Sequence, residues 1–92
     1  MDNLLDQFKK RMKISHSIED DTLLNILNAS VEDIKIKCGN FDVSVHTRAR
    51  ELVLERSRYV YNDSVEFFDD NFVSAILSLN IELSTTTASV EG

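Results

Sequence analysis

The chain has 92 residues, of which 42% are hydrophobic and 28% charged, so it is long enough for one small globular domain. Its formal net charge of −6 disfavours nucleic acid as a direct ligand, because proteins bind phosphates through a basic surface. The sequence has no proline and only two glycines, which leaves helices uninterrupted and favours an all-α fold.

No run of about 18 apolar residues is present to span a bilayer, and the N-terminal residues lack the apolar segment of a signal peptide. The single cysteine, Cys38, excludes an internal disulfide framework and is typical of a reducing compartment. We therefore expect a soluble protein that is made in the cytosol.

The first predicted helix covers residues 3–13, where apolar residues recur at helical spacing. Basic residues gather at its C-terminal end, where the helix dipole favours cations. They are Lys9, Lys10, Arg11 and Lys13. We interpret this cluster as a solvated helix end rather than a nucleic-acid patch.

The second predicted helix covers residues 18–38. Ser17 and Asp20 resemble a capping box at its start, and Gly39 is a typical left-handed stop. One apolar arc is formed by Leu23, Leu24, Leu27, Val31, Ile34 and Cys38. Ile36 lies on the polar face, so it is either an exposed side chain or a contact with a neighbouring subunit.

The third predicted helix, residues 45–62, is apolar on two sides. Its main arc is formed by Val45, Ala49, Leu52, Val53, Tyr59 and Val60. Leu54 and Tyr61 lie nearly opposite, which is typical of a helix that is central to a bundle or shared between two contacts. We expect Ser44 to cap this helix, and Phe41 and Val43 in the preceding loop to pack against the core.

Arg56 falls within the main apolar arc of residues 45–62. Its aliphatic stem could lie along the helix with the guanidinium reaching solvent. Alternatively, the guanidinium pairs with a carboxylate in a buried or interfacial position. The sequence does not name the partner.

The C-terminal part is predicted to contain an ordered loop at residues 65–71 and a fourth helix at residues 71–81. Residues 84–92 lack a helical period and contain one large apolar residue, Val90, so we expect a flexible polar tail after a helical domain of residues 1–83. Its β-propensity suits strand addition to a partner, with Thr85, Thr86, Thr87 and Val90 as the binding candidates.

Candidate catalytic and metal-binding groups do not form a known motif. His16, His46 and Cys38 are scattered without zinc-ligand spacing. An acidic segment, Asp63, Glu66, Asp69 and Asp70, matches no EF-hand. We therefore predict no enzyme activity, no cofactor and no bound metal, and expect the chain to bind other proteins.

The order of elements resembles the small head–tail connector (adaptor) proteins of long-tailed bacteriophages, over roughly residues 4–83. The resemblance rests on a short first helix, a long second helix with an acidic start (EDDTLLNILNASVEDIKIKCG), and a third helix that ends in Tyr61-Asn62-Asp63-Ser64. A short last helix and a polar tail complete it. The chain departs from the family's pattern in having no Pro or Gly before the last helix.

This resemblance implies a structural virion protein at the head–tail junction, present in the host cytoplasm during assembly. Such proteins form a dodecameric ring that joins the portal to the stopper or tail-completion protein and lines the DNA exit channel. An acidic lumen would let DNA pass without specific binding. The candidates for subunit contacts are Ile36, Leu54, Arg56 and Tyr61, and the tail is the candidate for portal binding.

Two other functions remain open. A small acidic helical regulator, such as an antirepressor or a toxin-neutralising inhibitor, would bind a single protein target. A helix-turn-helix DNA-binding protein is disfavoured, because the arginines of residues 45–62 lie on several faces of the helix. The mass of the purified chain, alone and with a portal protein, distinguishes a ring from a regulator.

Overall fold

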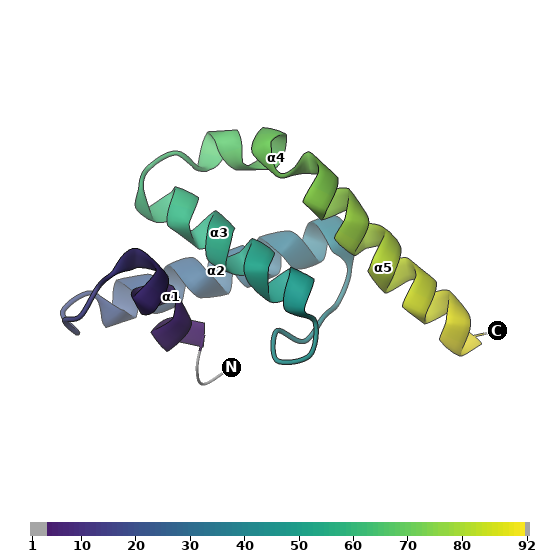
Figure 1. Cartoon of the computed structure of the whole chain (residues 1–92), viewed down its shortest axis with the longest axis horizontal. Coiled ribbons are helices and arrows are strands. Elements are labelled where there is room, and N and C mark those ends of the chain that lie inside the picture. The colour runs from purple at the N-terminus through teal and green to yellow at the C-terminus, as the bar shows by residue number, and fades with distance from the viewer. Residues whose placement is uncertain (1–3, 92) are drawn as a thin grey trace.

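The computed structural model describes residues 4–91, and the side chains of residues 4–84. The helices are α1 (Leu4–Met12), α2 (Asp20–Cys38), α3 (Thr47–Tyr61), the 3₁₀ turn η1 (Val65–Phe67), α4 (Phe68–Asn71) and α5 (Val73–Glu91). This described part contains no strand, which confirms the all-α fold. The molecule is elongated, and the outer part of α5 extends away from the other helices (Figure 1).

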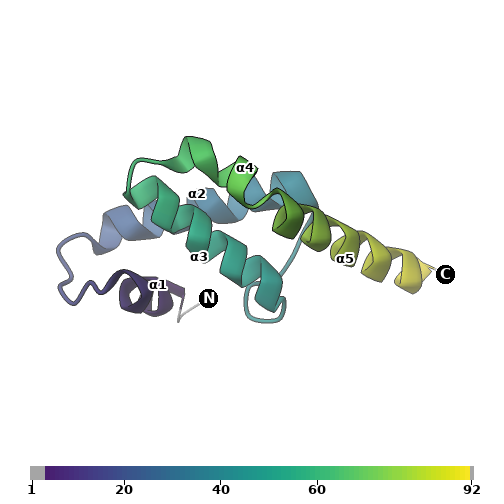
Figure 2. The same cartoon turned by 45° about the horizontal axis from the view of Figure 1, so that its top comes forward.

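Helix α3 is the centre of the fold. It contacts α1, α2, η1 and α5, and Figures 1 and 2 show it crossing α2 at an angle. Its second apolar side is covered as well as the first, since Leu54 on that side is only 1% exposed. The prediction of a helix central to a bundle is therefore confirmed.

A single apolar core joins all the helices. Phe8 of α1, Leu27 of α2, Val53 of α3 and Leu79 of α5 are almost completely buried within it. Phe41 and Val43, in the loop between α2 and α3, also lie in this core, as predicted.

The predicted caps are wrong at the starts of α2 and α3. Helix α2 follows Glu19, which makes no side-chain cap hydrogen bond, and Ile18 lies in the connection before it. Helix α3 follows His46. The hydroxyl of Ser44 is not available as a cap because it donates to Asp42 Oδ1 over 2.6 Å, inside a turn that Asp42 organises.

Residues 65–71 were predicted to form a loop, and this is wrong, because they form η1 and α4. Phe68 is completely buried, stacks on Phe72 at 4.8 Å between ring centroids, and meets Tyr59 edge-on at 5.7 Å. This packing compensates for the low intrinsic stability of such short helices.

Helix α5 continues through Glu91, well past the predicted end at residue 81. No glycine or proline lies between residue 81 and Gly92, and Leu83 is still buried, so nothing terminates the helix at residue 81. The side chains of Thr85, Thr86, Thr87 and Val90 lie outside the described residues. An extended conformation of this segment on a partner stays a prediction.

Candidate interaction surfaces

Arg56 is paired with a carboxylate, as the second of the two interpretations requires. Its Nε lies 3.1 Å from Asp33 Oδ2 on α2, and its NH1 group donates to Ser30 Oγ over 3.1 Å. Ser57 donates to the same Ser30 oxygen over 3.0 Å. Because Ser30 and Ser57 are small and fully buried, α2 and α3 approach closely at this point. Arg56 thus serves the packing of its own chain.

Lys37 extends this polar network to α4. Its Nζ lies 2.7 Å from Asp33 Oδ2 and also pairs with Asp69. Partial burial alone would lower the pKa of Lys37, but the two carboxylates outweigh it and raise that pKa above its usual value. The cation therefore ties α4 to α2.

Two polar contacts to the backbone fix α5 on the end of α2. Asn80 donates to the carbonyl of Lys37 over 3.1 Å, and the thiol of Cys38 donates to the carbonyl of Ile76 over 3.4 Å. Burial raises the pKa of the Cys38 thiol, so the sulfur stays protonated at neutral pH. These contacts hold α5 in a defined orientation.

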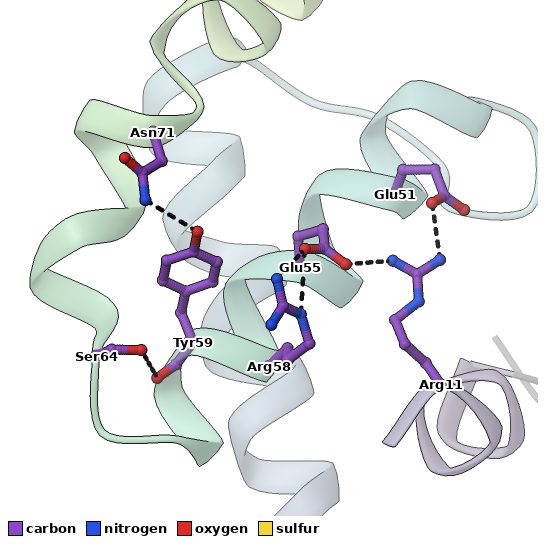
Figure 3. Close-up of polar contacts among 7 residues, drawn as sticks. All are labelled: Arg11, Glu51, Glu55, Arg58, Tyr59, Ser64 and Asn71. Carbon is purple, nitrogen blue, oxygen red and sulfur yellow. Dashed lines mark hydrogen bonds and ion pairs between the residues drawn. The ribbon is translucent and has the colours of Figure 1, made fainter. Parts of the chain in front are cut away.

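The basic cluster at the end of α1 was predicted to be a solvated helix end, but two of its four residues form ion pairs within the molecule. Arg11 donates to Glu55 Oε2 over 2.6 Å and to Glu51 Oε1 over 2.7 Å, as Figure 3 shows. Lys9 pairs with Asp20 over 2.7 Å. Within the described residues, Lys10 and Lys13 are exposed and make no ion pair.

Residues near the C-terminal end of α3 position the following segment, which contains η1 and α4. Arg58 donates to Glu55 Oε1 over 2.7 Å, and Asn71 donates to the hydroxyl of Tyr59 over 3.0 Å (Figure 3). Ser64 donates to the Tyr59 carbonyl over 3.3 Å. Through Tyr59, α3 therefore positions both ends of the segment that contains η1 and α4.

The four residues predicted to contact another subunit differ in their burial and in their contacts within the chain. Leu54 is wrong for this role, because α3 is covered on several sides and the side chain is buried inside its own chain. Tyr61 is half-buried, and its hydroxyl donates to Glu19 Oε2 over 3.2 Å, while Arg56 is held by Asp33. Ile36 is 83% exposed and remains a candidate.

A surface that the sequence reasoning missed lies on α5. Val73, Leu77 and Ile81 are spaced four residues apart and are each more than half exposed, at 60%, 58% and 57%. Leu79 and Leu83 are buried on the side that faces the core. The available signal was the presence of apolar residues on both sides of this helix. We call Val73, Leu77 and Ile81 the α5 outer stripe.

No family model, curated protein or solved structure matches this chain.

Polar side chains in the described part of the chain do not assemble into a metal site. There, no three His, Cys, Asp or Glu residues come together as metal ligands. A hollow of about 570 Å³ opens to solvent between the start of α3 and α5, where Arg48 pairs with Glu82.

None of the helices in the described part of the chain has the length and apolar character needed to cross a membrane.

Proposed function

We propose that the chain is a structural virion protein of the head–tail connector type. Copies of it would form a ring, with twelve subunits as the family resemblance implies, that joins the portal to the stopper or tail-completion protein. The observation that carries this proposal is the α5 outer stripe. A helix that is apolar on both sides and covered on one is typical of a subunit that is completed by a partner.

The order and lengths of the first three helices agree with this proposal, whereas α5, with 19 residues, is longer than the short last helix of the resemblance. A short α1, a long α2 with an acidic first turn, and α3 ending at Tyr61-Asn62 are the features on which the resemblance rests. Each is present as a helix with close to the expected bounds. The proposal places the protein at the head–tail junction of the virion, and in the host cytoplasm during assembly.

The charge distribution suits a channel through which DNA passes. Residues 63–92 contain six acidic residues and no basic ones. A ring that turned this part toward its lumen would repel the phosphates of DNA and let the duplex slide.

The end of α5 is the proposed portal-binding segment. Leu83 is the last side chain shown to be buried, and Figure 1 shows the helix projecting beyond the body after it. A projecting segment can reach a partner without disturbing the core. The candidates within it remain Thr85, Thr86, Thr87 and Val90.

The test is a mass measurement of the full chain, alone and mixed with the portal protein encoded in the same genome. We expect a large closed assembly in at least one of the two states. Deleting residues 84–92 is expected to leave the melting temperature nearly unchanged and to weaken portal binding by about tenfold or more, since the segment adds contacts only in the complex. A chain that binds no portal, and instead forms a one-to-one complex with a single regulatory target, would overturn the proposal in favour of a regulator.

A further inference from the structure

Helix α1 is attached to the rest of the chain by one apolar side and by ion pairs near its C-terminal end. Leu4 and Phe8 are buried, whereas the other residues of α1 are half-buried or exposed. Lys9 pairs with Asp20 of α2, and Arg11 pairs with two carboxylates of α3. These ion pairs are partly open to solvent, where such pairs contribute little to stability. The attachment of α1 is therefore specific but limited in extent.

The connection between α1 and α2 is exposed and begins at a strained residue. We call residues 13–19 the α1 hinge, and Figures 1 and 2 show it at one end of the long axis. Residues 15–18 are exposed, and Ile18 among them is 88% exposed. Lys13 has a φ of 60°, in the left-handed region that favours glycine over lysine. Extension of the hinge relieves this strain.

The hinge is long enough to carry α1 to a neighbouring copy. Its seven residues span about 24 Å when extended, and the two shorter dimensions of the molecule are 28 and 17 Å. An extended hinge therefore reaches a copy that lies alongside.

The position that α1 occupies has an acidic border. Asp20 of α2 and Glu51 and Glu55 of α3 provide the carboxylates that pair with Lys9 and Arg11. A second copy supplies a helix with the same basic and apolar residues at the same spacing. The structure thus defines which helix fits this position, and only the chain that supplies it can change.

We propose that α1 is an arm that neighbouring copies exchange, so that the α1 of one copy binds α2 and α3 of the next. It makes there the contacts that it makes within its own chain in the structure. Because these contacts are the same in both forms, the balance between the forms depends on the hinge and on protein concentration. Each copy donates one α1 and accepts one, so exchange closes within a pair or runs around the proposed ring. Only exchange around a ring rests on the proposed function.

The closed form is expected to dominate at high dilution, because the hinge keeps α1 near its own chain at a high effective concentration. Exchange becomes favourable when many copies fold close together. The fraction of exchanged arms should therefore rise with protein concentration.

The test uses unaltered full-length chains, half of them labelled with heavy nitrogen, which are unfolded and then refolded together over a range of concentrations. A carbodiimide joins lysine to a carboxylate in direct contact, and Lys9 Nζ lies 2.7 Å from Asp20 Oδ1. The two residues fall in different tryptic peptides, so mass spectrometry shows whether both come from one chain. Exchange is expected to give cross-linked pairs of one heavy and one light peptide, in a proportion that rises with concentration.

Lys37 and Asp69 are the matched control for the cross-link. They form an ion pair between α2 and α4, and neither residue belongs to α1. Their cross-linked peptides should carry the same label at every concentration.

A variant of the hinge supplies a second test. Lys13→Gly should lower the proportion of mixed pairs by about fivefold, because glycine adopts the left-handed region without strain and so favours the closed form. Asp63→Gly is its control, since Asp63 has a φ of 58° in the turn after α3, away from the hinge, and it should leave the proportion unchanged. Far-UV circular dichroism checks that both variants keep their helix content.

Several results would overturn the inference. Same-label pairs alone for Lys9 and Asp20 at every concentration would do so, as would mixed labels that appear equally for Lys37 and Asp69. A proportion that Lys13→Gly leaves unchanged would exclude the hinge as the cause of exchange. If the chain forms a ring on the portal and still gives only same-label pairs, the inference fails while the proposed function stands. If the labels mix but the chain never binds a portal, the proposed function fails while the exchange stands.

Discussion

Asp33 is the residue on which the packing of α2 against α3 and α4 most depends. One of its oxygens lies within 3.1 Å of both the Arg56 guanidinium and the Lys37 ammonium. Two cations this close together repel each other unless a carboxylate lies between them. The side chain of Arg56 is only 18% exposed, so water cannot fully replace the carboxylate.

Replacing Asp33 with Asn should therefore lower the free energy of unfolding by about 1–3 kcal/mol, since it removes the carboxylate that pairs with the partly buried Arg56 and leaves Lys37 with Asp69 alone. Urea denaturation at neutral pH measures the change. Glu32→Gln is the matched control, because it removes the same charge from an exposed neighbour on α2, and it should alter stability by less than about 0.5 kcal/mol. Equal effects of the two substitutions would show that the network adds nothing.

Leu54 and Ile36 show how far the burial of a single residue could be predicted from the sequence. Both lie off the main apolar arc of their helices, and both were predicted as subunit contacts. Leu54 is buried and Ile36 is exposed, because other elements cover the second side of α3 while none of the described residues covers that side of α2. The periodicity of one helix cannot show where another helix packs.

At the scale of elements, α1 is held to α3 by a cluster of charges as well as by its apolar side. Arg11 joins Glu51 and Glu55, and Arg58 joins Glu55 from the next turn of α3. Burial alone would raise the pKa of Glu55, but the hydrogen bonds from Arg58 and Arg11 outweigh it and hold that pKa below its usual value. The ionised form is therefore favoured by folding.

This shift predicts how stability changes with pH. A carboxylate whose pKa is lower in the folded state than in the unfolded one stabilises the fold above the unfolded pKa, near 4.3, and loses that contribution as the pH falls through the folded value. Urea unfolding of the parent and of Glu55→Gln between pH 7 and pH 3 should show a difference in unfolding free energy that shrinks below about pH 4.5. A difference that is constant across this range would mean that Glu55 acts by packing and not by its charge.

Most of the elements could be predicted from the sequence. The bounds of α1, α2 and α3 agree with the predicted ranges to within two residues, because each has a clear apolar period. The segment with η1 and α4 could not be found this way. Its helical turns depend on Phe68 packing against Tyr59 of α3, and the apolar period within the segment itself does not show this contact. The polar composition after residue 81 predicts the end of the helix, whereas α5 continues because no residue in this segment breaks a helix.

At the scale of the whole molecule, the α5 outer stripe leaves three apolar side chains exposed in the single chain. If the proposed ring covers them with another copy, they add stability only in the assembled state, so apparent stability should depend on concentration. We predict that the melting temperature of the parent rises with protein concentration.

The Leu77→Asp variant provides the comparison for this prediction, because Leu77 is exposed and makes no contact needed by the core. Its melting temperature should be independent of concentration and close to that of the parent at high dilution. Differential scanning calorimetry over a hundredfold range of concentration measures both. A parent whose melting temperature does not change over that range would show that the stripe stays uncovered.

The contacts of Arg11 affect the order in which parts of the chain can fold during synthesis. The two carboxylates that hold it lie 40 and 44 residues further along. At a synthesis rate of about 5–20 residues per second, α1 leaves the ribosome roughly 2–9 s before Glu55 does. A nine-residue helix is marginal on its own, and before α3 emerges α1 has only its contacts with α2, such as the ion pair of Lys9 with Asp20, to hold it. The attachment of α1 is thus completed only when a segment made several seconds later becomes available to it.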